Sequence, residues 1–223
     1  MRRPLNIVVF ASGGGQNARN IFATARQYPN LLKINALICN RKQAGVLTFA
    51  EEYQIPSVII PVPFRSSKSQ ARLDHEAQIS NQLATLAFDY ICLAGYMRIF
   101  TASFIARYPH PSWPVSKIIN IHPSLLPAFK GYSGYADAFH YGVKLGGVTT
   151  HFVNEEVDGG LILHQRHFPR FANDTLDSFI ERGRQQEYIC YRETLLALAA
   201  EDFHTQEKPF RLFLSTDRHA SSR

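Results

Sequence analysis

Short apolar runs of strand length alternate with segments of helical periodicity, and this alternation is the feature that most limits how the chain can fold. Leu5 to Ala11 is the first apolar run, Ser12-Gly13-Gly14-Gly15 interrupts it, and helical spacing follows over 17–27. The same order predicts strands at 34–39, 57–61, 89–94 and 117–121, and helices at 46–53 and 69–86. Strands interleaved with helices indicate a doubly wound α/β fold with a mostly parallel sheet.

The pattern changes after Ala136. Two further strands are expected at 147–154 and 161–169, separated by the turn from Glu155 to Gly160. So short a connection favours an antiparallel pair at the C-terminal edge of the sheet. A closing helix is expected at 177–200. We therefore expect a single domain over 1–203, followed by a polar C-terminal tail over 204–223.

Composition limits the partners and the compartment. Hydrophobic residues make up 45% of the 223 residues, enough for a sizeable core, and the formal charge of +6 is scattered, which suits small anionic substrates. We expect no nucleic-acid partner. Cys39, Cys92 and Cys190 lie far apart, which predicts buried thiols rather than a disulfide or a zinc site. Neither a signal peptide nor a run of roughly 18 apolar residues is evident, so we expect a cytoplasmic protein without a membrane span.

A glycine-rich turn between the first expected strand and helix is the first candidate site. In Ser12-Gly13-Gly14-Gly15-Gln16-Asn17, the glycines allow a tight turn whose N–H groups can face an anion, and the helix N-terminus adds positive potential. A phosphate fits there; a turn without a ligand is the alternative. The segment matches neither Gly-x-Gly-x-x-Gly nor a Walker loop, which argues against both nucleotide-binding motifs.

Asn120 and His122 form a second candidate site. They lie two residues apart at the end of an expected strand, so both side chains point to one face of the sheet. Ligands of open α/β sheets bind at that end of the strands, and an amide beside an imidazole can stabilise an oxyanion. Asp158, which precedes Gly159-Gly160, could orient His122 and accept a proton. The alternatives are a strand-ending Asn, a core His and an ordinary turn Asp.

The segment from Leu93 to Phe100 ends an expected buried strand and begins a loop. Its apolar and aromatic side chains, together with the single cation of Arg98, suit a flat heteroaromatic ring. Taken alone, strand-to-helix packing explains the segment more simply.

Taken together, these segments resemble the glycinamide ribonucleotide formyltransferases, a family of folate-dependent enzymes of purine synthesis. The resemblance runs from Asn6 to about Leu198 with the motifs in family order. Its most specific parts are Asn120-Ile121-His122-Pro123-Ser124-Leu125-Leu126-Pro127, His151-Phe152-Val153, Asp158-Gly159-Gly160 and Leu93 to Ile99. It implies a metal-independent enzyme that moves a formyl group from 10-formyltetrahydrofolate to the amine of glycinamide ribonucleotide. The implied partners are these two small molecules, and the implied assembly is a monomer or a homodimer.

The same resemblance implies roles for individual residues. Three fall on the family's catalytic triad, in which the amide and a protonated imidazole would stabilise the oxyanion of the tetrahedral adduct: Asn120, His122 and Asp158. Others fall on the turn that holds the phosphate and on the residue that contacts the ribose hydroxyls: Gly14, Gly15, Gln16 and Asn17 for the former, Glu187 for the latter. A last group falls on the folate site: Arg72, Met97, Arg98, Ile99 and Phe100. The implied halves are a ribonucleotide-phosphate half over 1–95 and a folate and catalytic half over 96–203.

The chain departs from the family pattern at several positions. Gln16 stands where the family usually has a small Ser, Ser133 and Tyr135 replace histidines that often lie beside the active site, and the connection over 108–117 is longer than usual. Two alternatives stay open: a formyltransferase for another small amine such as an amino sugar nucleotide, and a catalytically degenerate folate- or nucleotide-binding module. Enzymes of the first kind generally lack the glycine-rich turn, and an intact Asn, His and Asp set argues against the second.

Overall fold

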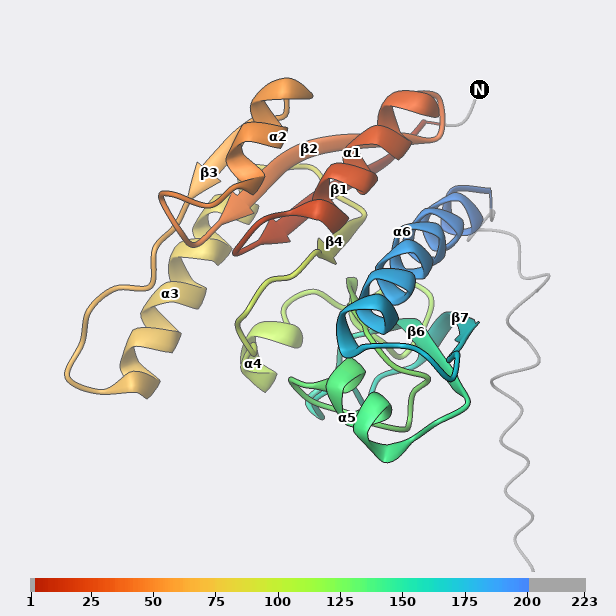
Figure 1. Ribbon diagram of the computed structural model, residues 1–223. Coiled ribbons are helices and arrows are strands. Elements are labelled where there is room, and N and C mark those ends of the chain that lie inside the picture. Colours follow the sequence, from red (N-terminus) through yellow and green to blue (C-terminus); the bar gives the residue numbers. More distant parts are fainter. Residues whose placement is uncertain (1–2, 201–223) are drawn as a thin grey trace, which may run out of the picture.

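One seven-stranded sheet runs through residues 3–200, the part of the chain that the computed structural model describes (Figure 1). The strands are β1 (Leu5–Ala11), β2 (Leu32–Cys39), β3 (Ser57–Ile59), β4 (Tyr90–Leu93), β5 (Ile118–His122), β6 (Leu145–Phe152) and β7 (Ile162–Pro169). Their order is β3-β2-β1-β4-β5-β6-β7. The first five strands are parallel, whereas β6 and β7 are antiparallel. The mostly parallel sheet with an antiparallel C-terminal edge is thus confirmed; the expected tail over 204–223 lies outside the described residues.

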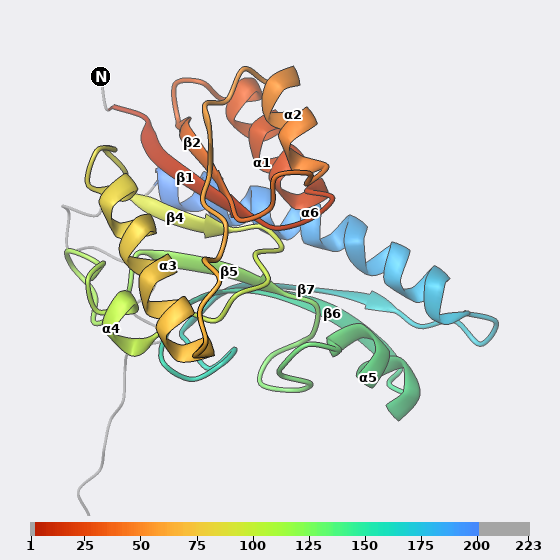
Figure 2. The ribbon, with the colours of Figure 1, turned by 90° about the vertical axis from the view of Figure 1, so that its left-hand side faces the viewer.

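Helices cover both faces of this sheet (Figures 1 and 2). They are α1 (Gln16–Gln27), α2 (Val46–Glu52), α3 (Lys68–Leu83), α4 (Ala102–Ile105), α5 (Gly134–Tyr141) and α6 (Leu176–Ala200). Alternate residues of β1 build two cores: Ile7 and Val9 pack with α1, α2 and α6, while Val8 and Phe10 pack with α3 and α4. All four side chains are fully buried, and each such burial stabilises the fold by about 1.5–3 kcal/mol.

The sequence did not predict α4 or α5. The second omission matters more, because α5 begins at Gly134 beside the candidate site; its C-cap is Gly142, in a left-handed conformation with φ 86°. The segment that leads into it, Gly131-Tyr132-Ser133-Gly134, has the composition of a turn. The other expected elements are present; the largest shift is at the end of α3, which stops at Leu83 instead of residue 86.

The ends of β1, β4 and β5 meet at one edge of the sheet. There the N–H of Ser12 donates to the carbonyl of Gly95 at 3.1 Å, and the Ser12 hydroxyl accepts from the N–H of Met97 at 2.9 Å. These bonds join the glycine-rich turn to the segment after β4, so two of the candidate sites are neighbours. Among the described helices, none is long and apolar enough to cross a membrane.

Candidate active site

Asn120 and His151 are partners in the antiparallel register of β5 and β6. Such pairs share one face of a sheet, and here Nδ2 of Asn120 lies 3.4 Å from Nε2 of His151. Nδ1 of His151 lies 2.9 Å from the carbonyl oxygen of Phe152, which can only accept, so Nδ1 carries the proton. Nε2 is then an acceptor, and it orients the Asn120 amide so that the NH₂ group points toward His151.

His122 lies between two acceptors. Its Nε2 donates to the carbonyl of Phe129 at 2.8 Å, and its Nδ1 lies 3.2 Å from Oδ2 of Asp158. The N–H of Gly131 donates to the same Asp158 oxygen at 2.8 Å, while Oδ1 lies 3.5 Å from Nε2 of His151. Asp158 has φ 53°, a left-handed conformation that Asp tolerates better than most residues. The structure therefore brings Asn120, His122 and Asp158 together, with His151 beside them.

The surroundings of His122 favour its neutral form. Burial lowers the pKa of His122 below its usual value, although the Phe129 carbonyl and the Asp158 carboxylate oppose this. Burial raises the pKa of Asp158, but the neighbouring imidazole of His151, the hydrogen bond from the Gly131 N–H and the imidazole of His122 outweigh it, and the net pKa is lowered. The resting site therefore pairs a neutral imidazole with a carboxylate. The protonated His122 that the resemblance implies belongs to the tetrahedral adduct, after the amine has attacked.

In the neutral form of His122, the position of the ring proton is defined. Because Nε2 needs its hydrogen for the Phe129 carbonyl, Nδ1 is left as a bare acceptor opposite Oδ2 of Asp158. Two acceptors 3.2 Å apart readily share a proton that enters between them. Chemically, this arrangement is a proton-accepting pair next to the NH₂ group of Asn120.

The glycine-rich turn exposes the N-terminus of α1. Its N-cap is Gly15, with φ 78° and no side chain to cap the helix, so the first N–H groups of α1 lack a side-chain acceptor. A Cβ at Gly15 would lie 2.4 Å from Cβ of Val46, whereas one at Gly13 or Gly14 would meet nothing within 4 Å. The side chain of Gln16 is exposed to solvent.

Glu187 of α6 lies next to this turn and is only 9% exposed. Its Oε2 accepts from Nδ2 of Asn17 and its Oε1 from the hydroxyl of Tyr135, each at 2.5 Å. Burial raises the pKa of Glu187, and the two hydrogen bonds partly oppose that effect. The residues expected to hold the phosphate and to contact the ribose hydroxyls thus lie together.

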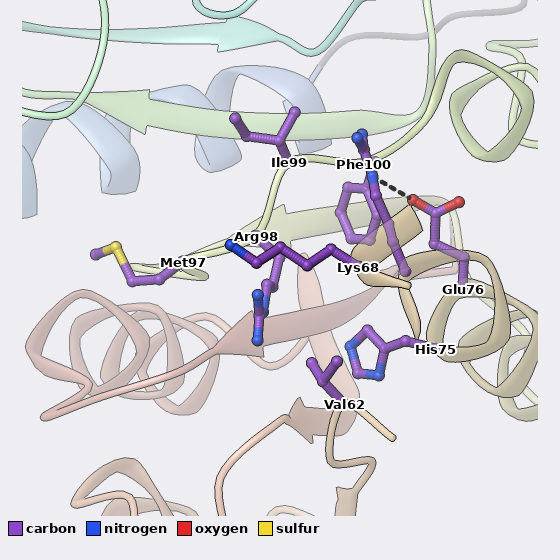
Figure 3. A pocket seen from close by; sticks show the side chains of 9 residues that line it. Val62, Lys68, His75, Glu76, Met97, Arg98, Ile99 and Phe100 are labelled. Atoms are coloured by element: carbon purple, nitrogen blue, oxygen red, sulfur yellow. Dashed lines mark ion pairs between the residues drawn. The ribbon is translucent and has the colours of Figure 1, made fainter. Parts of the chain in front are cut away.

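A cavity of about 340 Å³ lies between α3 and the segment after β4 (Figure 3). It is lined by all five residues expected at a folate site and by four others: Arg72, Met97, Arg98, Ile99 and Phe100, with Val62, Lys68, His75 and Glu76. Figure 3 shows Lys68 and Arg98 extending into the same space. Nε2 of His75 is bonded to the Tyr96 hydroxyl at 2.8 Å, and burial lowers the pKa of His75. The cavity combines apolar walls with three cationic side chains.

Sequence reasoning missed several groups at this edge of the sheet. His151 was part of a recognised motif but had no assigned role, because its place opposite Asn120 depends on the β5–β6 register. The Phe129 carbonyl and the Gly131 N–H are backbone groups that no residue pattern reveals. Lys68 lies one turn before Arg72 on α3, and that spacing is a signal that could have identified it.

The three cysteines are free and buried, as expected from their spacing. Within residues 3–200, no group of His, Cys, Asp or Glu side chains is placed to hold a metal ion.

Known proteins share both the sequence and the fold. Residues 5–195 match the formyl transferase family model, and the chain therefore belongs to the formyl transferase family. It is similar to the phosphoribosylglycinamide formyltransferase of Haemophilus influenzae, with 38% identity over 83% of this chain and 82% of the relative, and to that of Bacillus subtilis, with 35% identity over 85% and 92%. The crystal structure of the Brucella melitensis phosphoribosylglycinamide formyltransferase superposes with a TM-score of 0.78, at 35% identity over 89% of this chain and 97% of that one.

Proposed function

We propose that this chain transfers the formyl group of 10-formyltetrahydrofolate to the amine of glycinamide ribonucleotide, a step of purine biosynthesis. The observation that carries the proposal is the meeting, at one edge of the sheet, of three features. They are the uncapped N-terminus of α1, the Asn120, His122 and Asp158 group, and the cationic cavity beside α3. The names of the Haemophilus influenzae and Bacillus subtilis relatives point to the same reaction.

The acceptor would lie between the glycine-rich turn and α6. Its phosphate would accept hydrogen bonds from the backbone N–H groups of the turn, where the helix macrodipole favours an anion. The residues in this role are Gly14, Gly15, Gln16 and Asn17. Glu187, which Asn17 already contacts, would accept hydrogen bonds from the ribose hydroxyls.

The formyl donor would occupy the cavity beside α3. A flat ring needs apolar walls, which Ile99 and Phe100 supply, and a glutamate tail needs cations, which Arg72, Arg98 and Lys68 supply. A volume of about 340 Å³ falls in the range of small-molecule sites.

The chemistry would use the two hydrogen-bonding groups described above. Asn120 gives one NH₂ hydrogen to His151, and the other would stabilise the formyl oxygen as it gains negative charge during attack by the amine. Nδ1 of His122 and Oδ2 of Asp158 would take the proton that the amine loses, and return one to the folate nitrogen when its bond to carbon breaks. Holding both substrates at one edge is the chain's other main contribution.

This proposal includes the expected organisation of the protein. Residues 1–95 would form the ribonucleotide-phosphate half and 96–203 the folate and catalytic half of one domain. The cavity is lined from both sides of that division, and Glu187 of the second half lies beside the turn of the first. A cytoplasmic enzyme with two small-molecule partners, acting as a monomer or a homodimer, is part of the same proposal.

An acceptor screen tests the assignment. Purified protein is incubated with 10-formyltetrahydrofolate and either glycinamide ribonucleotide or an amino sugar nucleotide, and release of tetrahydrofolate is followed. We expect turnover with glycinamide ribonucleotide to be much the faster. The reverse preference would support the amino sugar nucleotide alternative, and saturable binding without any turnover would identify a degenerate binding module.

A further inference from the structure

We infer that Tyr135 is a positioning residue that fixes the Glu187 carboxylate for recognition of two neighbouring hydroxyl groups on the acceptor. The inference rests on the proposed function, in which Glu187 faces a ribose. Tyr135 is one of the positions at which the chain departs from the family pattern.

The carboxylate of Glu187 is held symmetrically. Its Oε1 accepts from the Tyr135 hydroxyl and its Oε2 from Nδ2 of Asn17, each at 2.5 Å. Each oxygen therefore keeps one free lone pair, because a carboxylate oxygen can accept two hydrogen bonds. Two such oxygens, fixed in one plane, match the two hydroxyls of a vicinal diol.

Tyr135 and Gly183 are a matched pair, although they are far apart in the sequence. Gly183 lies in α6 one turn before Glu187, and a Cβ there would come within 2.3 Å of Cε1 and 2.6 Å of the hydroxyl of Tyr135. Glycine weakens a helix interior, so its presence needs a local reason. The Tyr135 ring supplies that reason, because it occupies the space that any side chain at position 183 would fill.

The ring of Tyr135 is also fixed on its other sides. It packs edge-to-face on Phe168 and on Phe179, with ring centroids 6.3 Å apart in both pairs. The preceding residue, Gly134, packs so closely on the active site that its Cβ would lie 3.1 Å from Nε2 of His122. These contacts therefore fix the position of the Tyr135 hydroxyl, in a segment that packs against His122 of the candidate active site.

A second hydrogen-bond acceptor lies beside the Glu187 carboxylate. Oδ1 of Asn17 is buried and has no hydrogen-bond partner, while Nδ2 of the same amide is bonded to Glu187. A buried acceptor without a donor is costly. A ligand that brings hydroxyl hydrogens to this place satisfies both Asn17 and Glu187, which is the chemistry of a ribose rather than a deoxyribose.

Tyr135→Phe tests the inference because it removes only the hydroxyl. With glycinamide ribonucleotide as acceptor, we expect its KM to rise about tenfold, as for loss of a hydrogen bond to a charged group. The folate KM and kcat stay within about twofold. The preference for the ribose acceptor over its 2′-deoxyribose analogue falls by a similar factor of about ten. Tyr141→Phe, at an exposed Tyr of the same helix, is the matched control and leaves all of these values unchanged.

Gly183→Ala is the second variant, because it displaces the Tyr135 ring without removing the hydroxyl. We expect the same loss of ribose preference, and it covers the case in which Tyr135→Phe fails to fold. An unchanged preference in a folded variant overturns the inference, as does an equal fall in kcat and in affinity for both substrates, which marks a purely structural tyrosine.

If the unaltered protein does not formylate glycinamide ribonucleotide, the proposed function fails. Calorimetric binding of ribose 5-phosphate against 2-deoxyribose 5-phosphate then tests Tyr135 separately: a preference lost in Tyr135→Phe supports the inference, and one that is absent or retained overturns it.

Discussion

Asn120 and His151 face each other across β5 and β6, and the ring nitrogen that His151 turns toward Asn120 carries no proton. This contact fixes which end of the amide faces the cleft. His151→Leu keeps much of the buried volume but removes the acceptor, so the amide is free to turn. Because a small misplacement of a catalytic group can cost about a hundredfold in rate, we expect kcat to fall by about that factor with little change in either KM. His167→Leu, at an exposed position of β7, is the control; equal activity of the two variants would contradict the role of His151.

The glycine-rich turn offers a pair of variants that separate binding from folding. A Cβ at Gly14 would meet nothing within 4 Å, so we expect Gly14→Val to fold while it blocks close approach of a phosphate to the backbone. We expect weaker binding of glycinamide ribonucleotide and unchanged binding of folate, measured by calorimetry.

Gly15→Val behaves differently, because Gly15 has φ 78° and its Cβ would overlap Val46. We expect a loss of stability of about 1–3 kcal/mol in denaturant unfolding.

If Gly14→Val retains full affinity for the phosphate-bearing substrate, the phosphate does not lie at this turn.

The cavity beside α3 predicts stabilisation by folate analogues. An antifolate with a pteridine-like ring, at a hundredfold excess over its Kd, adds about 2.7 kcal/mol to the free energy of unfolding. Arg72→Gln, which removes a cation from the cavity wall, reduces the rise in Tm, whereas Arg107→Gln, outside the lining, leaves it intact. Absence of a thermal shift with every reduced folate and antifolate would exclude this cavity as the donor site.

His110 makes stability depend on pH. Its Nδ1 accepts from the N–H groups of Ser112 and Trp113, both at 3.1 Å, so the ring is held in its neutral form. Burial, with a smaller contribution from Lys117, lowers the pKa of His110 to about 4 from 6.5. The unfolded chain therefore binds a proton that the folded chain does not, and stability falls as the pH drops from about 6.5 to about 4.

The size of this effect is measurable. At pH 5 we expect His110 alone to reduce the free energy of unfolding by about 2 kcal/mol relative to pH 8. His110→Asn retains an acceptor but no titrating group, so its stability falls less over this range than that of the unaltered protein. Parallel curves for His110→Asn and the unaltered protein would show that His110 is not the titrating group.

Patterns within the chain predicted most of the fold because the parallel strands are continuous apolar runs, and their ends carry glycines and polar residues. The sequence also placed Asn120 and His122 on one face, since both lie on one strand. The alternation of strands and helices did not reveal α5, because the residues leading into it look like a turn. The helix instead packs against β6 and α6, which lie far away in the sequence.

Relationships between distant residues could not be predicted in the same way. The pairing of Asn120 with His151 requires the β5–β6 register, and the pairing of Tyr135 with Gly183 requires the position of α6 over α5. The pKa of His122 also depends on such relationships, because local sequence does not reveal desolvation, which here exceeds the effect of the neighbouring carboxylate.

The most direct test is single-turnover formyl transfer by Asp158→Asn, with 10-formyltetrahydrofolate and glycinamide ribonucleotide both saturating. The substitution keeps an acceptor for the Gly131 N–H but removes the negative charge 3.2 Å from Nδ1 of His122, so the amine loses its proton-accepting pair. We expect the rate to fall by about 10²–10⁴-fold with both affinities nearly unchanged, whereas Glu155→Gln, in the same turn but exposed, stays at the original rate. A rate for Asp158→Asn within a few-fold of the unaltered protein would contradict the account and make Asp158 an ordinary turn residue.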